Sequence, residues 1–236
     1  MPELLVITPV KNSVETTLDT AKAIRNSSVR VTHVIFNDFS TEETKAVLEK
    51  NKAEIGYELI HLEDITGHPS PNYKLVLQIA QKRALEEKLP LLVVESDVVI
   101  HPDTIEKLLQ AMKKDGKSGL VGSVTVDDKG VVNFPYLKFK GVKEPEILTN
   151  RSLSFCCTLF SPEFLESYSF TGLDEAKDWY DTFISKKAIE LGFQNRVLMN
   201  APVWHRPHAS RPWKQLKYTN PLKYYFLKFW KGWDKI

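Results

Sequence analysis

The segment "LLVVESDVVI", residues 91–100, has the apolar character of a buried strand but contains two carboxylates, Glu95 and Asp97. An unpaired carboxylate inside a protein core is energetically costly. Two interpretations therefore stand. Either the strand ends at Val94 and the carboxylates point into solvent, or they hold something positively charged.

Strand-like and helix-like segments alternate four times between the N-terminus and residue 116. Short strand-like runs occupy 3–10, 31–38, 57–63 and 90–96, and helix-like runs follow at 13–28, 42–51, 73–88 and 102–116. Ser13, then Ser40 or Thr41, and Asn72 are suitable N-caps for the first three helices. This alternation predicts an α/β domain with a mostly parallel central sheet and helices on its faces.

Three of the predicted strands end in polar side chains. These are Lys11-Asn12, Asn37-Asp38 and Glu95-Ser96-Asp97. In open α/β sheets, ligands bind outside the carboxyl ends of the strands. We therefore expect a binding site at this edge of the sheet, with Glu95 and Asp97 in it.

The second half of the chain is less regular. Strands are predicted at 119–126, 152–160 and 196–205, a short helix from Pro162, and a longer helix at 173–192. The adjacent cysteines, Cys156 and Cys157, do not suit ordinary disulfide geometry, and we interpret them as two small buried apolar side chains. With no disulfide framework, no signal-peptide pattern and no apolar stretch of membrane-spanning length, we expect a cytoplasmic protein.

Charge is distributed unevenly along the chain, although the formal net charge is only +2. From Arg206 onward there are eight lysines and arginines and one acid, whereas residues 1–205 carry 24 basic and 29 acidic residues. The sequence thus predicts a mildly acidic body with a basic tail.

The spacing of Glu95 and Asp97 suits a divalent cation at a strand end. Carboxylate oxygens favour a hard metal such as Mg²⁺ or Mn²⁺. The alternative is a pair of solvated or helix-capping acids, and these residues alone leave both open.

Four motifs occur in an order that resembles family 2 glycosyltransferases. They are "VITPVKN", "FNDFSTEE", "VVESDV" and "DWYDTF" followed by "ELG". The resemblance covers about residues 3–211. It implies a GT-A (nucleotide-diphospho-sugar transferase, Rossmann-like) fold in a single domain, residues 1–211, followed by an extension at 212–236.

The resemblance implies an inverting enzyme that moves a sugar from a nucleotide sugar, with a UDP-sugar as the expected donor, to an acceptor hydroxyl. Asp97 matches the metal-binding carboxylate for Mn²⁺ or Mg²⁺. Glu95 stands where the first aspartate of the motif is usual, and either binds the metal or contacts the donor ribose or a metal-bound water. His205, just after the last strand, fits a residue that completes the metal site or contacts the diphosphate.

The other donor contacts implied by the resemblance lie along the same strand ends. Asp38 matches the carboxylate that accepts the uracil N3–H; its alternative role is to cap the next helix. The remaining substrate-binding candidates are Pro9, Lys11, Asn12, Lys74, Ser96, Arg206 and Arg211. Of these, Arg206 and Arg211 would supply positive charge for the phosphates, and Lys74 is alternatively a solvated helix-surface lysine.

Asp181 matches the catalytic base of the family, which takes the proton from the attacking hydroxyl. The family usually has Glu before this Asp, where Tyr180 stands here, so Asp178 remains an alternative base. Acidic residues at a helix N-terminus also interact with its dipole, which is the structural alternative.

The tail segment "TNPLKYYFLKFWKGWDKI", residues 219–236, predicts an amphipathic helix with Asn220 as its cap and Pro221 at its first position. Its apolar face consists of Leu222, Tyr225, Phe226, Phe229, Trp230 and Trp233. A basic helix with such a face is typical of attachment to an anionic membrane surface, here through 220–235. The alternative is packing against the body or against a second subunit in a homodimer.

Together these features predict a cytoplasmic enzyme, peripheral at the inner face of the membrane, that acts on a glycan or lipid-linked acceptor in bacterial surface polysaccharide synthesis. The acidic body argues against a nucleic-acid partner. A sugar nucleotidyltransferase would need a glycine-rich loop, and "TPVKNSVE" has no glycine. The remaining alternative is a non-catalytic nucleotide-sugar-binding relative or a membrane-docked partner protein.

Overall fold

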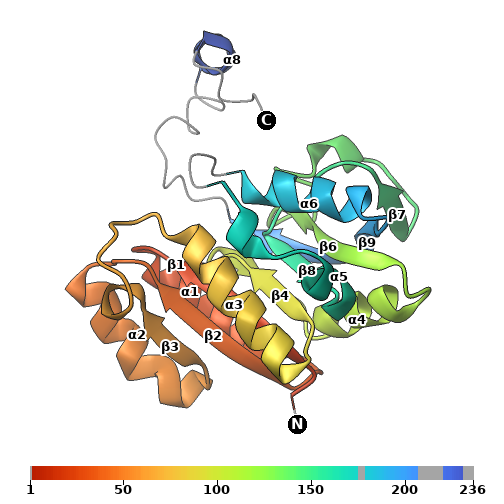
Figure 1. Cartoon of the computed structure of the whole chain (residues 1–236). Coiled ribbons are helices and arrows are strands. Elements are labelled where there is room, and N and C mark those ends of the chain that lie inside the picture. Colours follow the sequence, from red (N-terminus) through yellow and green to blue (C-terminus); the bar gives the residue numbers. More distant parts are fainter. Residues whose placement is uncertain (1, 175–178, 207–219, 231–236) are drawn as a thin grey trace. The chain divides into compact units, whose positions relative to one another are not determined.

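The computed structural model of the chain describes residues 2–174, 179–206 and 220–230. Contacts divide the chain into two units, Met1–His205 and Arg206–Ile236, and each is described by itself. The first unit holds a nine-stranded sheet with its helices, and the second holds the helix α8 (Figure 1).

The strands are β1 (Leu4–Val10), β2 (Val31–Asn37), β3 (Glu58–His61), β4 (Leu91–Val94), β5 (Val98–Val99), β6 (Ser118–Val126), β7 (Glu146–Thr149), β8 (Cys157–Phe160) and β9 (Gln194–His205). The α-helices are α1 (Val14–Arg25), α2 (Glu42–Ile55), α3 (Tyr73–Glu87), α4 (Thr104–Lys113), α5 (Pro162–Ser167), α6 (Tyr180–Glu190) and α8 (Pro221–Trp230). Short 3₁₀ turns lie at Leu62–Asp64, Leu137–Phe139 and Phe170–Gly172. None of the described helices is long and apolar enough to cross a membrane.

The sheet confirms the mostly parallel arrangement predicted from the alternation. Its strand order is β3-β2-β1-β4-β8-β6-β9-β5, with β7 paired to β9. The strands β1, β2, β3, β4, β6 and β9 run in one direction, and β5, β7 and β8 oppose them. The polar ends of β1, β2, β4 and β9 therefore lie along one edge of the sheet.

Both faces of the sheet are covered by helices, which explains why its central strands β1 and β4 are largely apolar on both faces. In β1, Leu5 and Ile7 belong to the core that includes residues of α3, α5 and α6. The alternate residues, Leu4 and Val6, pack in the core formed with α1 and α4. This is the side-chain alternation expected of a strand buried on both sides. Figure 1 shows α3, α5 and α6 in front of the sheet.

Two predicted elements are shorter in the structure. The helix predicted at 173–192 is found at Tyr180–Glu190, because Leu173 closes the preceding 3₁₀ turn. The strand predicted at 152–160 begins only at Cys157. The backbone N–H groups of Leu153 and Ser154 donate to side-chain oxygens instead of to a neighbouring strand.

The "LLVVESDVVI" segment forms two strands, so the strand ends at Val94 as the first interpretation required. The residues after the turn form β5, which pairs antiparallel with β9 rather than continuing β4. The sequence did not predict β5 or β7, since two and four residues are too few for a recognisable period. The pairing of β5 with β9 brings the end of β9 to the turn that carries Glu95 and Asp97.

His33 in β2 makes the stability of the chain dependent on pH. Its side chain is buried, with Nε2 3.0 Å from Thr8 Oγ1 and the ring against that of Tyr57. Burial lowers the pKa of His33 from 6.5 to about 3. Below pH 6.5 the unfolded chain therefore binds a proton that the folded chain does not. We expect this histidine to lower the free energy of unfolding by about 2 kcal/mol when the pH falls from 7 to 5.

Denaturant unfolding of wild type and a His33→Gln variant at pH 7 and pH 5 measures this contribution. A neutral amide should remove about 2 kcal/mol of the pH dependence. His101 lies at an exposed position, so His101→Gln is the matched control for the substitution itself. Equal pH dependence in wild type and His33→Gln would contradict the assignment.

Candidate active site

Three strands deliver polar side chains to the turn at Glu95–Asp97. Val94 of β4 lies opposite Cys157 of β8, and the Glu95 N–H donates to the carbonyl of Cys156 at 3.0 Å. On the other side of the turn, Val98 of β5 lies opposite His205 of β9. The sheet pairing thus gathers the turn, Cys156 and His205 at one place.

The side chains of this cluster contact one another directly. Cys156 Sγ lies 3.1 Å from Glu95 Oε2 and 3.9 Å from His205 Nε2. His205 Nε2 is also 3.6 Å from Asp97 Oδ2. Asp97, Cys156 and His205 are buried, and Glu95 is half-buried. The carboxylates therefore face a buried cluster with other ligand-type atoms rather than open solvent.

A hydrogen bond to the backbone fixes the orientation of the His205 ring. Its Nδ1 lies 2.8 Å from the carbonyl oxygen of Phe134. A carbonyl oxygen can only accept a hydrogen bond, so Nδ1 carries the hydrogen. The backbone carbonyl of His205 in turn accepts from Asn133 Nδ2 at 3.0 Å. This arrangement leaves Nε2 directed at Asp97 and Cys156, as is usual for histidines that bind metals.

The cluster carries an excess of negative charge. Burial raises the pKa of Glu95, and the neighbouring Asp97 charge raises it further. Burial works against the charged form of His205, but the contact with Asp97 and the Glu95 charge outweigh it and raise its pKa. Two carboxylates and one imidazole at this spacing would be stabilised by a bound cation.

Asp181 lies in the first turn of α6, where its charge acts on Glu95. Its Oδ1 accepts from the backbone N–H of Thr182 at 2.8 Å. Burial, followed by the charges of Glu95 and Asp181, raises the pKa of Tyr73 well above its usual value. Asp181 also contributes to the raised pKa of Glu95, so its carboxylate acts on the same cluster. Asp178 lies outside the described residues.

The ends of β1 and β2 are joined by a network around Asn12. Its backbone N–H donates to Ser40 Oγ at 3.0 Å, and its Oδ1 accepts from the Thr41 N–H at 2.8 Å. Asn12 and Phe39 both have a φ of 54°, in the left-handed region that is costly for phenylalanine. Such strain is often kept at functional sites. Of the two predicted caps of α2, Thr41 is the one that accepts from the helix, through the Thr44 N–H.

Asp38 holds the loop before α3 rather than capping α2. Its Oδ2 accepts from Ser70 Oγ at 2.7 Å and from the Asn72 N–H at 2.9 Å. Its Oδ1 accepts from Asn72 Nδ2 at 2.8 Å. The Asn72 side chain is therefore used by Asp38, and makes no capping bond to α3. Each carboxylate oxygen has two lone pairs, so an additional donor can still be accommodated.

The other predicted substrate contacts lie along the same edge or outside the described residues. Pro9 lies in β1, and the exposed Lys11 has its Nζ 3.5 Å from the Asp38 carbonyl. Ser96 is buried within the turn, and Lys74 is half-buried in the first turn of α3. Arg206 directly follows β9 and belongs to the second unit. Arg211 lies outside the described residues.

Sequence reasoning missed two residues of this site. Cys156 is buried as predicted, but its sulfur contacts Glu95 instead of packing only as an apolar group. Tyr73 was not considered, although its buried hydroxyl has no hydrogen-bond partner among the described residues. Its ring contacts those of Phe155 and Tyr180, at centroid distances of 6.5 and 6.2 Å. No local sequence pattern marked either residue.

Comparison with known families now identifies the fold. The sequence profile described as Glycosyl transferase family 2 matches residues 5–168. The chain belongs to glycosyl transferase family 2. The matched region includes the candidate residues from Pro9 to Asp97 and ends before Asp181 and His205. A search of curated protein sequences finds no match.

Solved glycosyltransferase structures share this fold. The mannosyltransferase PcManGT from Pyrobaculum calidifontis, in complex with GDP-Man and Mn²⁺, has a TM-score of 0.65 at 13% identity, covering 91% of this chain and 59% of its own. TarS from S. aureus with UDP-GlcNAc has 0.63 at 18%, covering 89% and 60%. GalNAc-T7 with UDP, GalNAc and Mn²⁺ has 0.63 at 13%, covering 87% and 44%. This family 2 chain thus spans between 44% and 60% of these longer proteins.

The residues of the cluster suit a divalent cation. Asp97 supplies a carboxylate, and His205 supplies an imidazole nitrogen whose ring is already oriented by Phe134. Carboxylate and imidazole ligands are both acceptable to Mn²⁺. The excess negative charge of the cluster provides the electrostatic attraction. The chemistry of these side chains therefore fits a metal of the kind present in two of the compared structures.

Proposed function

We propose that this chain transfers a sugar from a nucleotide sugar, with a UDP-sugar as the expected donor, to an acceptor hydroxyl. The proposal includes a divalent cation, Mn²⁺ or Mg²⁺, and inversion at the anomeric carbon. One observation carries it: Asp97 and His205 are buried side by side where β4 and β9 end, with Nε2 3.6 Å from Oδ2. Membership of glycosyl transferase family 2 supports the same activity.

The cation would be held by Asp97 and His205, with Glu95 as a further ligand or as a contact to the donor. A divalent cation at this position stabilises the negative charge that develops on a leaving diphosphate. The protein's part is to orient the ligands. The Phe134 carbonyl holds the His205 ring, and the turn between β4 and β5 holds both carboxylates.

The nucleoside would lie along the ends of β1 and β2, next to Asn12 and Asp38. The bonds from Ser70 and Asn72 fix the Asp38 carboxylate in place. A fixed acceptor at this point can receive the N3–H of uracil on a remaining lone pair. Two of the compared structures contain UDP or UDP-GlcNAc, which supports a uridine nucleotide, and the third contains GDP-Man.

Asp181 would act as the base. In the proposed reaction its carboxylate takes the proton of the acceptor hydroxyl while that oxygen attacks the anomeric carbon from the side opposite the diphosphate. The Thr182 N–H donates to Oδ1 and fixes the orientation of this carboxylate.

The nucleotide preference and the metal requirement can be tested together by thermal unfolding of the full chain. The ligands are UDP, GDP, CDP and dTDP, each with and without Mn²⁺. We expect UDP to raise the melting temperature only with Mn²⁺, corresponding to about 2.7 kcal/mol at 100 times the dissociation constant. If none of the four nucleotides shifts the melting temperature, with or without Mn²⁺, the proposal is contradicted and a membrane-docked partner protein is favoured.

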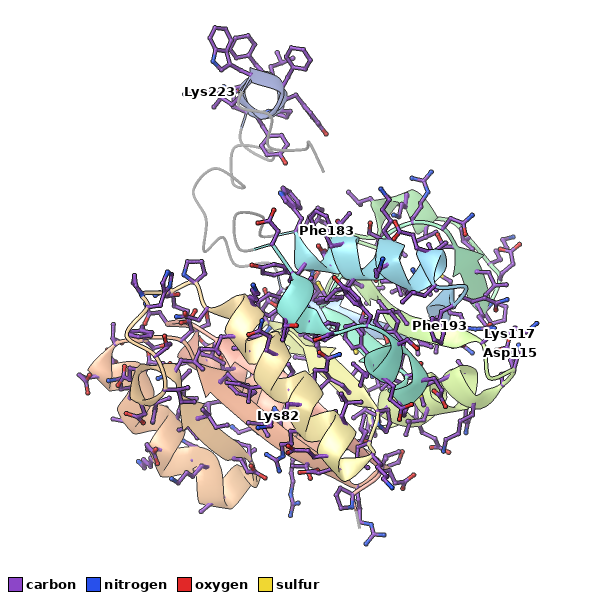
Figure 2. All side chains as sticks on the ribbon, viewed as in Figure 1. Lys82, Asp115, Lys117, Phe183, Phe193 and Lys223 are labelled. Atoms are coloured by element: carbon purple, nitrogen blue, oxygen red, sulfur yellow. The ribbon has the colours of Figure 1, made fainter. Side chains whose placement is uncertain are left out.

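We propose that α8 attaches the protein to an anionic membrane, where a lipid-linked acceptor would be presented. The helix starts as predicted, with the Lys223 N–H donating to Asn220 Oδ1 at 3.1 Å. Its most exposed apolar residues are Leu222 and Phe229, both 87% exposed, followed by Trp230, Phe226 and Tyr225. Figure 2 shows ring side chains projecting from this helix. The basic tail complements an anionic lipid surface. Trp233 lies outside the described residues.

Replacing Leu222, Phe226 and Phe229 together with serine is expected to reduce vesicle binding at least about tenfold, because each buried apolar side chain contributes about 1.5–3 kcal/mol. Co-sedimentation with phosphatidylglycerol vesicles measures this, and phosphatidylcholine vesicles should bind less. A matched control is Leu137→Ser, which removes an exposed leucine elsewhere. Unchanged binding of the triple variant would disprove the membrane role of α8.

A further inference from the structure

The Cys156 thiol has no part in the proposed transfer, yet it lies inside the cluster. Its Sγ is 3.1 Å from Glu95 Oε2 and 3.9 Å from His205 Nε2. One ligand atom from each of Glu95, Cys156 and His205 lies within 4.8 Å of the others. Cys156 and His205 are almost fully buried, so these ligand atoms lie inside the protein rather than on its surface.

The sulfur changes the kind of metal that this group prefers. Mg²⁺ and Mn²⁺ favour oxygen ligands, whereas a thiolate favours Zn²⁺ and other soft or borderline cations. A combination of sulfur, imidazole nitrogen and carboxylate oxygen is typical of zinc. We infer that Glu95, Cys156 and His205 form a binding site for a thiophilic divalent cation such as Zn²⁺, which overlaps the proposed manganese site at His205.

The geometry needs little adjustment for such a site. With zinc bonds of about 2.3 Å to sulfur and about 2.1 Å to nitrogen or oxygen, tetrahedral ligands lie about 3.6 Å from the sulfur. The observed separations from Cys156 Sγ are 3.9 Å to His205 and 3.1 Å to Glu95. They differ from the required value by about 0.3 Å and about 0.5 Å, respectively. Asp97 Oδ2, 3.6 Å from His205 Nε2, is within reach of the fourth position.

Binding at this site exchanges one proton for one metal bond. The Cys156 S–H bond, which donates to Glu95 in the structure, breaks, and a sulfur–zinc bond forms. The proton goes to the solvent buffer, and no change of oxidation state is involved. Mn²⁺ would leave this S–H bond intact, because it binds to Asp97 and His205 without the sulfur.

The site offers a means of inhibition. A cation that takes Glu95, Cys156 and His205 together would remove His205 from the manganese site and close the position where the diphosphate is expected. This consequence rests on the function proposed above, whereas the zinc site itself does not. Its test therefore uses metal binding alone, without sugar donor, Mn²⁺ or acceptor.

Titration of the full chain with Cd²⁺, followed by thiolate-to-metal charge-transfer absorption, tests the inference directly. We expect the band in wild type and in the Cys157→Ser control, and no band in Cys156→Ser. Cys157 is the adjacent buried cysteine, so it matches Cys156 in residue type and burial. Zn²⁺ affinity should fall more than about 100-fold in Cys156→Ser, since loss of an outer partner of a ligand already costs 10–100-fold. A Cys156→Ser protein with wild-type Zn²⁺ affinity would overturn the inference.

X-ray absorption at the zinc edge provides a second test that needs only the wild-type chain, should Cys156→Ser fail to fold. The inference predicts one sulfur neighbour at about 2.3 Å together with nitrogen or oxygen neighbours. A zinc environment without sulfur would overturn it. Either result is independent of whether UDP binds with Mn²⁺, so failure here is distinguishable from failure of the proposed transferase activity.

Discussion

Replacing Asp97 with asparagine is expected to lower kcat/KM for sugar transfer by about 10²–10³-fold. The carboxylate is buried beside His205, and the amide would keep its size but lose the charge that attracts the cation. Loss of one group that stabilises developing charge typically has an effect of this size. Initial rates measured over a range of Mn²⁺ concentrations should show both a lower maximum and a weaker Mn²⁺ dependence.

Asp103→Asn is the matched control for this substitution. Asp103 is exposed six residues further along the chain, where it forms an ion pair with Lys107 at 2.7 Å. Such surface pairs contribute little to stability. The control should therefore retain wild-type rates. Wild-type Mn²⁺ dependence in Asp97→Asn would contradict the metal assignment.

Replacing Asp181 with asparagine should lower kcat by about 10²–10⁴-fold, the range usual for loss of a general base. An asparagine Oδ1 can still accept the Thr182 N–H, so the first turn of α6 should be retained. UDP binding with Mn²⁺ should be unchanged, because Asp181 acts on the acceptor. Single-turnover rates and a nucleotide-binding titration on the same protein separate these effects.

Two further variants make this result specific to Asp181. Asp178→Asn tests the alternative base, which precedes the start of α6 at Tyr180 in the sequence. Glu190→Gln, at the exposed far end of α6, should have no effect. If Asp178→Asn abolishes transfer and Asp181→Asn does not, the base is Asp178.

The first half of the fold follows closely from the sequence. The strands β1 to β4 and the helices between them have strong local periodicity, and their order alone predicts a parallel sheet. The elements that were missed, β5 and β7, depend on pairing with β9 and have almost no local pattern of their own. The start of α6 was misplaced because Leu173 and Asp174 continue the apolar and polar pattern without being helical.

The candidate site was only partly predictable, for the same reason. Charged or titratable residues at the ends of apolar strands predict a site, and this pattern identified Glu95, Asp97 and His205. The sequence around Cys156 predicts only a buried cysteine. The pairing of β4 with β8 places its sulfur beside Glu95. Asn72 was predicted to cap a helix, and capping was the alternative role of Asp38. The structure shows them bound to each other, a contact between residues 34 positions apart that no local pattern encodes.

The central claim is that Asp97 and His205 hold a divalent cation against the diphosphate of a nucleotide. A crystal structure with UDP and Mn²⁺, with anomalous scattering recorded at the manganese edge, tests it most directly. The claim predicts one anomalous peak bonded to Asp97 and to Nε2 of His205, and to oxygens of the diphosphate. Manganese bound elsewhere, or UDP bound away from the ends of β1, β2 and β4, would contradict it.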